Sequence, residues 1–150
     1  TSCTGGADDY LELLLGEILP EAEKVLPGPP AWRGIAGYSL AGLFAVYSLY
    51  KTDVFSRAAS MSGSFWFEGF PVFVRSHVMK RKSDCIYFSL GDKESSTDNP
   101  ILNVVQHNTG EIESLCRANG IHTAFVLNSG NHYQACNQRT AAGICWILNQ

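Results

Sequence analysis

The sequence predicts an α/β fold of three layers, in which helices cover both faces of a mostly parallel sheet. Short apolar runs typical of buried strands alternate along the chain with longer segments of helical periodicity, and this alternation indicates strands joined by crossover helices. The chain has 150 residues, of which 45% are hydrophobic. That is enough for one domain with its own core, and we therefore expect residues 1–150 to form a single domain.

The first third of the chain begins with a helical pattern. Asp8 and Asp9 can start a helix that runs over residues 8–26, with leucines spaced near 3.6 residues apart. Pro20 lies inside this segment, so we expect a kink or a break there. The Pro- and Gly-rich residues 27–30 end the helix. A short strand, a turn and an apolar helix are then expected at residues 32–36, 37–39 and 40–51.

The rest of the chain continues the alternation. Asn99 followed by Pro100 is typical of a helix start, because asparagine caps free amides and proline suits the first helical position. Gly120 is suited to end that helix. Further strands are expected at residues 55–61, 84–90 and 121–127, and further helices at residues 70–79, 99–119 and 134–148. In such sheets the active site lies at the carboxyl ends of the strands.

Charge and cysteine content exclude several classes of protein. The net charge is −3 and the only local basic cluster is residues 80–82, so we expect no nucleic-acid partner. No apolar run reaches the about 18 residues that cross a membrane. The five cysteines are irregularly spaced without a CxxC pair, which argues against a metal site or a disulfide framework. We expect free, mostly buried thiols and a cytoplasmic protein.

The segment GYSLAG, residues 37–42, carries the clearest chemical motif. It is close to the nucleophile elbow G-x-S-x-G, and it stands between a strand and a helix as that motif requires. On such a turn the hydroxyl of Ser39 projects into the cleft, and its neighbours must be small, as Gly37 and Ala41 are. The backbone amide of Leu40 would point at the developing oxyanion. A plain glycine-serine turn is the alternative interpretation.

His132 is the expected general base, because it directly follows the last strand. The other histidines fall in expected helices or at the start of a strand: His77, His107 and His122. In this kind of fold the order along the chain is serine, acid, histidine, so the acid is expected in the loop after the third strand.

Two carboxylates follow that strand in the segment GDKE, residues 91–94. Glu94 is favoured, because its longer side chain and later position allow it to reach the far nitrogen of His132. Asp92 is the alternative acid, with hydrogen bonding to the loop backbone as its other role. Asp98 is a third candidate, with capping of the following helix as its other role.

An aromatic loop, SGSFWFEGF at residues 62–70, follows the second strand on the same rim. It could form a cleft wall for an aromatic or acyl group, or a hydrophobic cluster beneath the loop. We take Phe65 and Trp66, together with Tyr38 of the elbow, as candidates for substrate contact.

Four segments together resemble one esterase family of the α/β-hydrolases, which includes enterochelin (siderophore) esterases, feruloyl esterases and S-formylglutathione hydrolases. They are GYSLAGL at 37–43, SGSFW at 62–66, GDKE at 91–94 and GNH at 130–132. The resemblance covers nearly the whole chain from Tyr10 onward, and SGSFW is its most specific part. It implies the α/β-hydrolase fold, with Ser39 as nucleophile, His132 as base, Glu94 as acid and Trp66 as a substrate contact.

The family pattern also implies strands ahead of the elbow strand. One of the loops between those strands donates a second oxyanion amide. We therefore expect residues 1–150 to be the C-terminal part of a longer domain, with its last four or so strands. The expected function is that of a serine hydrolase that cleaves a small-molecule carboxylic ester through an acyl-enzyme, with no metal or organic cofactor.

Two other functions are compatible with these residues. One is a non-catalytic module that binds a ligand or a protein on the same scaffold, because fold does not imply function. The other is a peptidase or acyltransferase that uses the same three side chains. Neither a nucleic acid nor a membrane is expected as a partner, and nothing in the sequence specifies an oligomeric state.

Overall fold

The computed structural model describes residues 5–150, which form two compact units, one that ends at Trp32 and one that comprises Arg33–Gln150. The smaller unit is helical: α1 (Ala7–Leu13), a π-helical turn η1 (Leu14–Ile18) and α2 (Leu19–Glu23). No helix in residues 5–150 is long and apolar enough to cross a bilayer.

The break expected at Pro20 does not occur. Pro20 lies in the first turn of α2, where the missing amide hydrogen costs least, and the wider π-helical turn directly precedes it. The chain therefore stays helical through the proline by changing its hydrogen-bonding pattern. The helix ends at Glu23, earlier than the periodicity of the apolar residues predicts.

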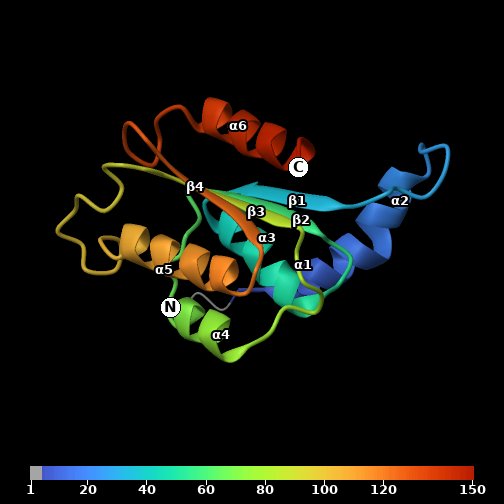
Figure 1. Cartoon of the computed structure of the whole chain (residues 1–150), viewed down its shortest axis with the longest axis horizontal. Coiled ribbons are helices and arrows are strands. Elements are labelled where there is room, and N and C mark those ends of the chain that lie inside the picture. The colour runs from blue at the N-terminus through green and yellow to red at the C-terminus, as the bar shows by residue number, and fades with distance from the viewer. Residues whose placement is uncertain (1–4) are drawn as a thin grey trace. The chain divides into compact units, whose positions relative to one another are not determined.

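The larger unit is a three-layer α/β structure, which confirms the predicted fold class. Its four strands, β1 (Gly34–Tyr38), β2 (Arg57–Met61), β3 (Cys85–Gly91) and β4 (His122–Asn128), are all parallel and lie in chain order. The helices are α3 (Leu40–Lys51), α4 (Phe70–Ser76), α5 (Val105–Ala118) and α6 (Cys136–Leu148). Figure 1 shows α6 on one face of the sheet, and α3 and α5 on the other.

The register brings the carboxyl ends of all four strands to one edge. Tyr38 pairs with Met61, Met61 pairs with Ser89, and Gly91 pairs with Asn128. The segments that leave the strands therefore start side by side, although they are far apart in the sequence. The segments that carry Ser39, Glu94 and His132 all leave the sheet at this edge.

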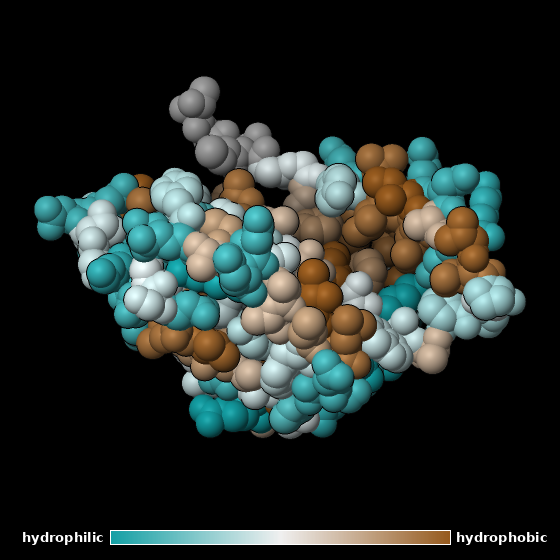
Figure 2. All heavy atoms as spheres, turned by 90° about the horizontal axis from the view of Figure 1, so that it is seen from above, coloured by the Kyte–Doolittle hydropathy of each residue, from teal (hydrophilic) through white to brown (hydrophobic). Residues whose placement is uncertain are grey.

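Apolar side chains fill both interfaces of the sheet. The α6 face packs through a buried cluster of Ala59, Met61, Cys85, Tyr87 and Ile147. Alternate strand residues point to the opposite face, and Ala58, Ile86, Phe88 and Leu90 there are fully buried. Helix α6 approaches the sheet closely at Gly143, where an added Cβ would lie 2.4 Å from the sulfur of Met61. The view from above shows hydrophobic side chains gathered over part of that face and mostly hydrophilic ones elsewhere (Figure 2).

Helix α5 begins at Val105 and not at the predicted Asn99. Asn99 does accept hydrogen bonds from the backbone amides of Ile101, Leu102 and Asn103. These bonds complete a single turn, and the chain then turns again before α5. Ile101 is 58% exposed, so there is little apolar burial to stabilise a continuing helix.

The four cysteines in the described part of the chain are free thiols. Cys85 and Cys116 are buried, Cys136 is partly exposed and Cys145 is exposed. The prediction of mostly buried thiols thus holds for two of these four, and Cys3 lies outside the described residues.

Candidate active site

Ser39 occupies the sharp turn between β1 and α3. Its φ of 60° and ψ of −123° lie in a region that residues other than glycine rarely adopt. The backbone is held there from three sides: the Ser39 amide donates to the Met61 carbonyl at 3.0 Å, and the Ser39 carbonyl accepts from the amides of Gly42, Leu43 and Ser64. The surrounding structure thus fixes an unusual conformation that presents the serine at the edge of the sheet.

The elbow depends on small residues where the strand and the helix meet. A Cβ on Gly37 would lie 2.2 Å from the carbonyl oxygen of Ala41 and 2.8 Å from the Ala41 Cβ. Helix α3 begins at Leu40, so the Leu40 amide is among the first amides of the helix, which have no carbonyl partner within it.

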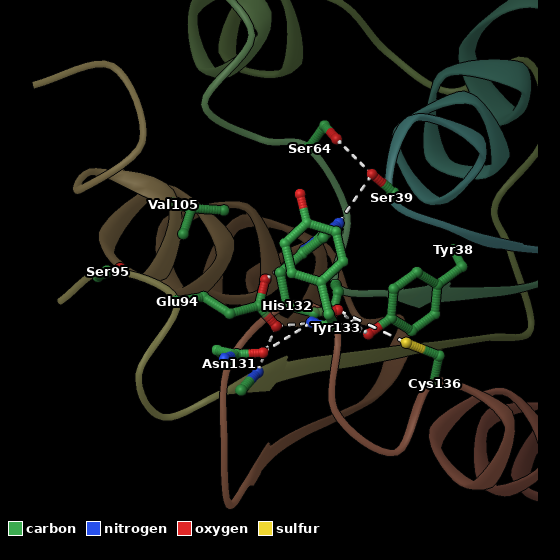
Figure 3. Close-up of polar contacts among 12 residues, drawn as sticks. Tyr38, Ser39, Ser64, Glu94, Ser95, Val105, Asn131, His132, Tyr133 and Cys136 are labelled. Atoms are coloured by element: carbon green, nitrogen blue, oxygen red, sulfur yellow. Dashed lines mark hydrogen bonds and ion pairs between the residues drawn. The ribbon is translucent and has the colours of Figure 1, made fainter. Parts of the chain in front are cut away.

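The imidazole of His132 lies between Ser39 and Glu94. His132 Nε2 is 3.1 Å from Ser39 Oγ, and His132 Nδ1 is 2.8 Å from Glu94 Oε2. A carboxylate can only accept, so Nδ1 carries the proton and Nε2 of the neutral ring is left to accept from the serine hydroxyl. On its other side the Ser39 hydroxyl is 3.3 Å from Ser64 Oγ (Figure 3).

Glu94 is nearly inaccessible, with 4% of its side chain exposed, whereas 30% of the His132 side chain is exposed. Glu94 Oε1 accepts from the Ser62 hydroxyl and the Gly91 amide, each at 2.7 Å. Burial raises the pKa of Glu94, but hydrogen bonds from His132, Ser62 and Gly91 outweigh burial and hold the pKa below its usual value. The carboxylate is therefore ionised at neutral pH despite its burial.

Asp92 and Asp98, the other two candidate acids, occupy different places. Asp92 Oδ1 accepts from the Gly130 amide at 2.9 Å and so takes the backbone role considered for it. Asp98 is exposed and does not cap α5, because α5 begins at Val105. Of the three carboxylates, only Glu94 is hydrogen-bonded to His132.

The loop that carries His132 is held through four consecutive carbonyl groups. The carbonyls of Ser129 and Asn131 accept from Arg139 Nη2, and that of Gly130 accepts from the Lys93 amide. The carbonyl of His132 itself accepts from the Tyr38 hydroxyl at 2.8 Å. The histidine loop is thus bonded to β1, to the acid loop and to α6.

Arg139 and Ser62 both contact Glu94, although neither was predicted as a site residue from the sequence. Arg139 is 2% exposed, and its Nη1 lies 3.0 Å from Glu94 Oε1. A signal was available, because Arg139 precedes Gly143 by one turn and Ile147 by two and therefore shares the buried face of α6. An arginine on such a face needs acidic or carbonyl partners.

A pocket of about 360 Å³ opens beside these side chains. Ser39, Glu94 and His132 line it, and its other lining residues include Trp66, Leu102 and Val105. A separate hollow of about 330 Å³, lined by residues such as Val74 and Cys116, contains none of the candidate residues. Among residues 5–150, no three histidine, cysteine or acidic side chains gather in a way that could hold a metal ion.

The three candidates for substrate contact differ in position. Trp66 lines the pocket, but Phe65 is fully buried and stacks on Phe70, with ring centroids 5.5 Å apart. Tyr38 is not among the lining residues either. Its ring centroid lies 5.5 Å from that of His132, whose carbonyl its hydroxyl binds. Both interpretations of the aromatic loop therefore apply, each to different residues: Phe65 belongs to the core and Trp66 to the pocket.

A parallel sheet covered on both faces, with a serine elbow after one strand, is the architecture of an α/β-hydrolase. Residues 2–141 match the family described as "Putative esterase", and the chain belongs to that family.

Solved structures share this fold. The chain aligns with the siderophore hydrolase EstA from Aspergillus nidulans with a TM-score of 0.73 and 20% identity, over 97% of this chain and 57% of that one. It aligns with the enterobactin esterase FES from Shigella flexneri with a TM-score of 0.76 and 17% identity, over 95% of this chain and 38% of that one. At these identities the similarity establishes the fold alone.

One curated protein, the uncharacterized protein YbbA of Bacillus subtilis (strain 168), is 24% identical over 114 residues. The match covers 74% of this chain and 46% of YbbA. The chain thus spans about half the length of this relative, and less than two thirds of EstA and FES.

Proposed function

We propose that the protein is a serine hydrolase that cleaves small-molecule carboxylic esters through an acyl-enzyme. Ser39 is the nucleophile, His132 the general base and acid, and Glu94 the carboxylate that orients the imidazole. The observation that carries the proposal is the line of hydrogen bonds from Ser39 Oγ through both ring nitrogens of His132 to Glu94 Oε2. Membership of an esterase family supports the ester bond as the target.

In the first half of the reaction, Ser39 Oγ attacks the ester carbonyl carbon while its proton passes to His132 Nε2. The resulting imidazolium is stabilised by the ionised Glu94, which itself remains unprotonated. The Leu40 amide, at the start of α3, donates to the oxyanion. The tetrahedral intermediate collapses when the alkoxide leaves and takes the proton from Nε2, so that an alcohol is released and an acyl-serine remains.

In the second half, water takes the place of the alcohol. It gives one proton to His132 Nε2 as its oxygen attacks the acyl carbon, and the second tetrahedral intermediate expels Ser39 Oγ, which recovers that proton. A carboxylic acid is released and the starting protonation states are restored. The lowered pKa of Glu94 supports this role, because its carboxylate stays charged throughout.

The lining of the pocket favours an ester with an apolar or aromatic acyl part. Trp66, Leu102 and Val105 contribute ring and aliphatic surface to the pocket that Ser39, Glu94 and His132 also line, and such surface binds apolar groups. The similarity to a siderophore hydrolase and an enterobactin esterase makes bulky natural esters the first substrates to test.

A fluorophosphonate probe tests the proposal directly. We expect it to label Ser39 in the full chain, and we expect Ser39→Ala to abolish both labelling and p-nitrophenyl ester hydrolysis. Ser76→Ala is the matched control, because Ser76 is exposed and its hydroxyl bonds only to backbone carbonyls of α4 and to a neighbouring histidine. The proposal fails if folded protein is not labelled and Ser39→Ala hydrolyses the ester as fast as the parent.

Product analysis separates the remaining functions. A chain that binds esters without turnover would be a binding module, and a preference for amide substrates or alcohol acceptors would indicate a peptidase or an acyltransferase. For an ester hydrolase we expect carboxylic acid as the dominant product in water.

A further inference from the structure

We propose that Arg139 is a positioning residue that joins the acid loop to the histidine loop through one guanidinium group and so sets the alignment of Glu94 with His132. The inference rests on the proposed function and extends it to a residue outside the three reactive side chains. It is carried by contacts of Arg139 with both loops.

The first set of contacts is with the acid. Arg139 Nη1 lies 3.0 Å from Glu94 Oε1, 3.1 Å from Ser62 Oγ and 3.3 Å from the Tyr38 hydroxyl. Because the Ser62 hydroxyl and the Gly91 amide also donate to Oε1, that oxygen is fully occupied. The other oxygen, Oε2, is directed to His132. Arg139 is thus one of three donors to Oε1 that together leave Oε2 to face the imidazole, and it is the charged one among them.

The second set of contacts is with the histidine loop. Arg139 Nη2 donates to the carbonyl of Asn131 at 3.0 Å and lies 3.4 Å from that of Ser129. Asn131 directly precedes His132, so the guanidinium holds the backbone from which the imidazole projects. One rigid, planar group therefore fixes the positions of both partners of the Glu94–His132 hydrogen bond.

Burial makes this bridge specific. The side chains of Arg139 and Glu94 are 1% and 4% exposed. A buried ion pair contributes little net stability, since the loss of hydration offsets the attraction. It does, however, impose a defined geometry, because Nη1 and Nη2 both find their acceptors inside the protein, while the buried Nε has no hydrogen-bond partner. The guanidinium fork suits this role, and a lysine ammonium, which is a point charge, cannot reach both loops in the same way.

Helix α6 places the guanidinium. Arg139 lies in its first turn, where its amide donates to the Ala135 carbonyl at 2.9 Å, and α6 packs on the sheet through Gly143 and Ile147. The packing of α6 on the sheet therefore sets the position of Arg139, and Arg139 in turn contacts Glu94 and the backbone beside His132.

The test replaces Arg139 in the full chain by lysine, which keeps the charge and loses the bridge. We expect Arg139→Lys to lower kcat for a p-nitrophenyl ester by about 10- to 100-fold through misplacement of the catalytic groups, with KM changed less than about threefold. The low-field proton resonance of the His132–Glu94 hydrogen bond should shift or broaden in the variant.

Arg57→Lys is the matched control. Arg57 Nη1 donates to the Ile147 carbonyl at 2.7 Å and thus binds the opposite end of the same helix. We expect this variant to retain kcat within about threefold and to keep the low-field proton. Equal losses in the two variants would show that Arg139 acts only through stability, and parental kcat with an unchanged resonance in Arg139→Lys would overturn the inference.

If Arg139→Lys does not fold, a measurement on the parent protein tests whether Arg139 bridges the two loops. In protein labelled with ¹⁵N-arginine, a bridging guanidinium rotates slowly, and the Arg139 Nη protons should give separate resonances. Fast rotation would overturn the inference. These outcomes are independent of the proposed function, which fails instead if the parent protein neither reacts with the fluorophosphonate nor hydrolyses an ester.

Discussion

The carboxylate of Asp92 accepts a hydrogen bond from the backbone amide of Gly130 at 2.9 Å, across 38 positions of the sequence. The carbonyl of Gly130 in turn accepts from the Lys93 amide at 3.1 Å. Asp92 and Glu94 are two residues apart, yet one binds the backbone of the histidine loop and the other binds the histidine ring. The two acids therefore differ in what their removal should do.

Glu94→Gln should lower kcat much more than Asp92→Asn does. The amide removes the charge that stabilises the imidazolium and favours the wrong tautomer, and we expect a loss of about 10²- to 10⁴-fold. Asp92→Asn keeps an acceptor oxygen for the Gly130 amide but loses the charge, so it should destabilise the fold by only about 1 kcal/mol, with kcat reduced less than about tenfold. Steady-state kinetics and urea unfolding of both variants check this, and the reverse order of kcat would assign the acid role to Asp92.

The lowered pKa of Glu94 also predicts how the free energy of unfolding depends on pH. The pKa of Glu94 in the folded protein lies below the about 4.3 of an unfolded glutamate, because hydrogen bonds to the ionised form outweigh the effect of burial. Its contribution to the free energy of unfolding is thus fully present above about pH 4.3 and is lost as the pH falls through the folded pKa.

Urea unfolding of the parent and of Glu94→Gln between about pH 7 and pH 3 measures this contribution. The free energy of unfolding of the parent should fall more steeply below about pH 4.3 than that of the variant, since glutamine does not titrate. Parallel pH dependences would show that Glu94 does not have a lowered pKa.

Gly37→Ala should destabilise the fold by about 3 kcal/mol, because the added Cβ meets the Ala41 backbone at 2.2 Å and backbone atoms cannot rotate away. Gly110→Ala in α5 is the matched control. Its nearest neighbour would be Phe125 Cε1 at 3.8 Å, and alanine is the better helix former, so a gain of up to about 1 kcal/mol is expected. Urea denaturation compares the two, and a tolerated Gly37→Ala would contradict the tight elbow.

Two adjacent aromatic residues should respond differently to truncation. Phe65→Ala removes a fully buried ring and should cost about 3–5 kcal/mol of stability. Trp66→Ala opens the pocket and should lower kcat/KM for aromatic acyl esters by about tenfold relative to acetate esters, with a smaller loss of stability. Thermal unfolding and kinetics with paired esters separate these effects. An unchanged ester preference in Trp66→Ala would remove Trp66 from the substrate pocket.

The layered fold and the sharp turn at Ser39 could be predicted because both depend on local sequence. Alternating apolar runs define the strands, and the small residues around Ser39 are required by the turn itself. The prediction that a helix starts at Asn99 was wrong for a related reason. A cap is also a local feature, but one turn satisfies it, and whether the helix continues depends on tertiary packing.

The remaining features depend on contacts between distant segments. The sequence favoured Glu94 over Asp92, but which of them bonds to His132 is decided by the path of the loop after β3, which short-range patterns do not specify. Arg139 was missed because its partners come from the elbow, the loops after β2 and β3, and the histidine loop. Phe65 and Trp66 are neighbours of similar character, and only the packing of Phe65 on Phe70 separates core from pocket.

The order of the strands has a consequence for biosynthesis. Because β1 to β4 pair in the order in which they are translated, each strand can join its predecessor as the nascent chain emerges, in line with the vectorial folding of domains during synthesis. Ser39 emerges 93 residues before His132, and Arg139 emerges later still. A nascent chain can therefore pair all four strands before Ser39 has an imidazole beside it, and the hydrogen bond between Ser39 and His132 forms only after β4 has been made.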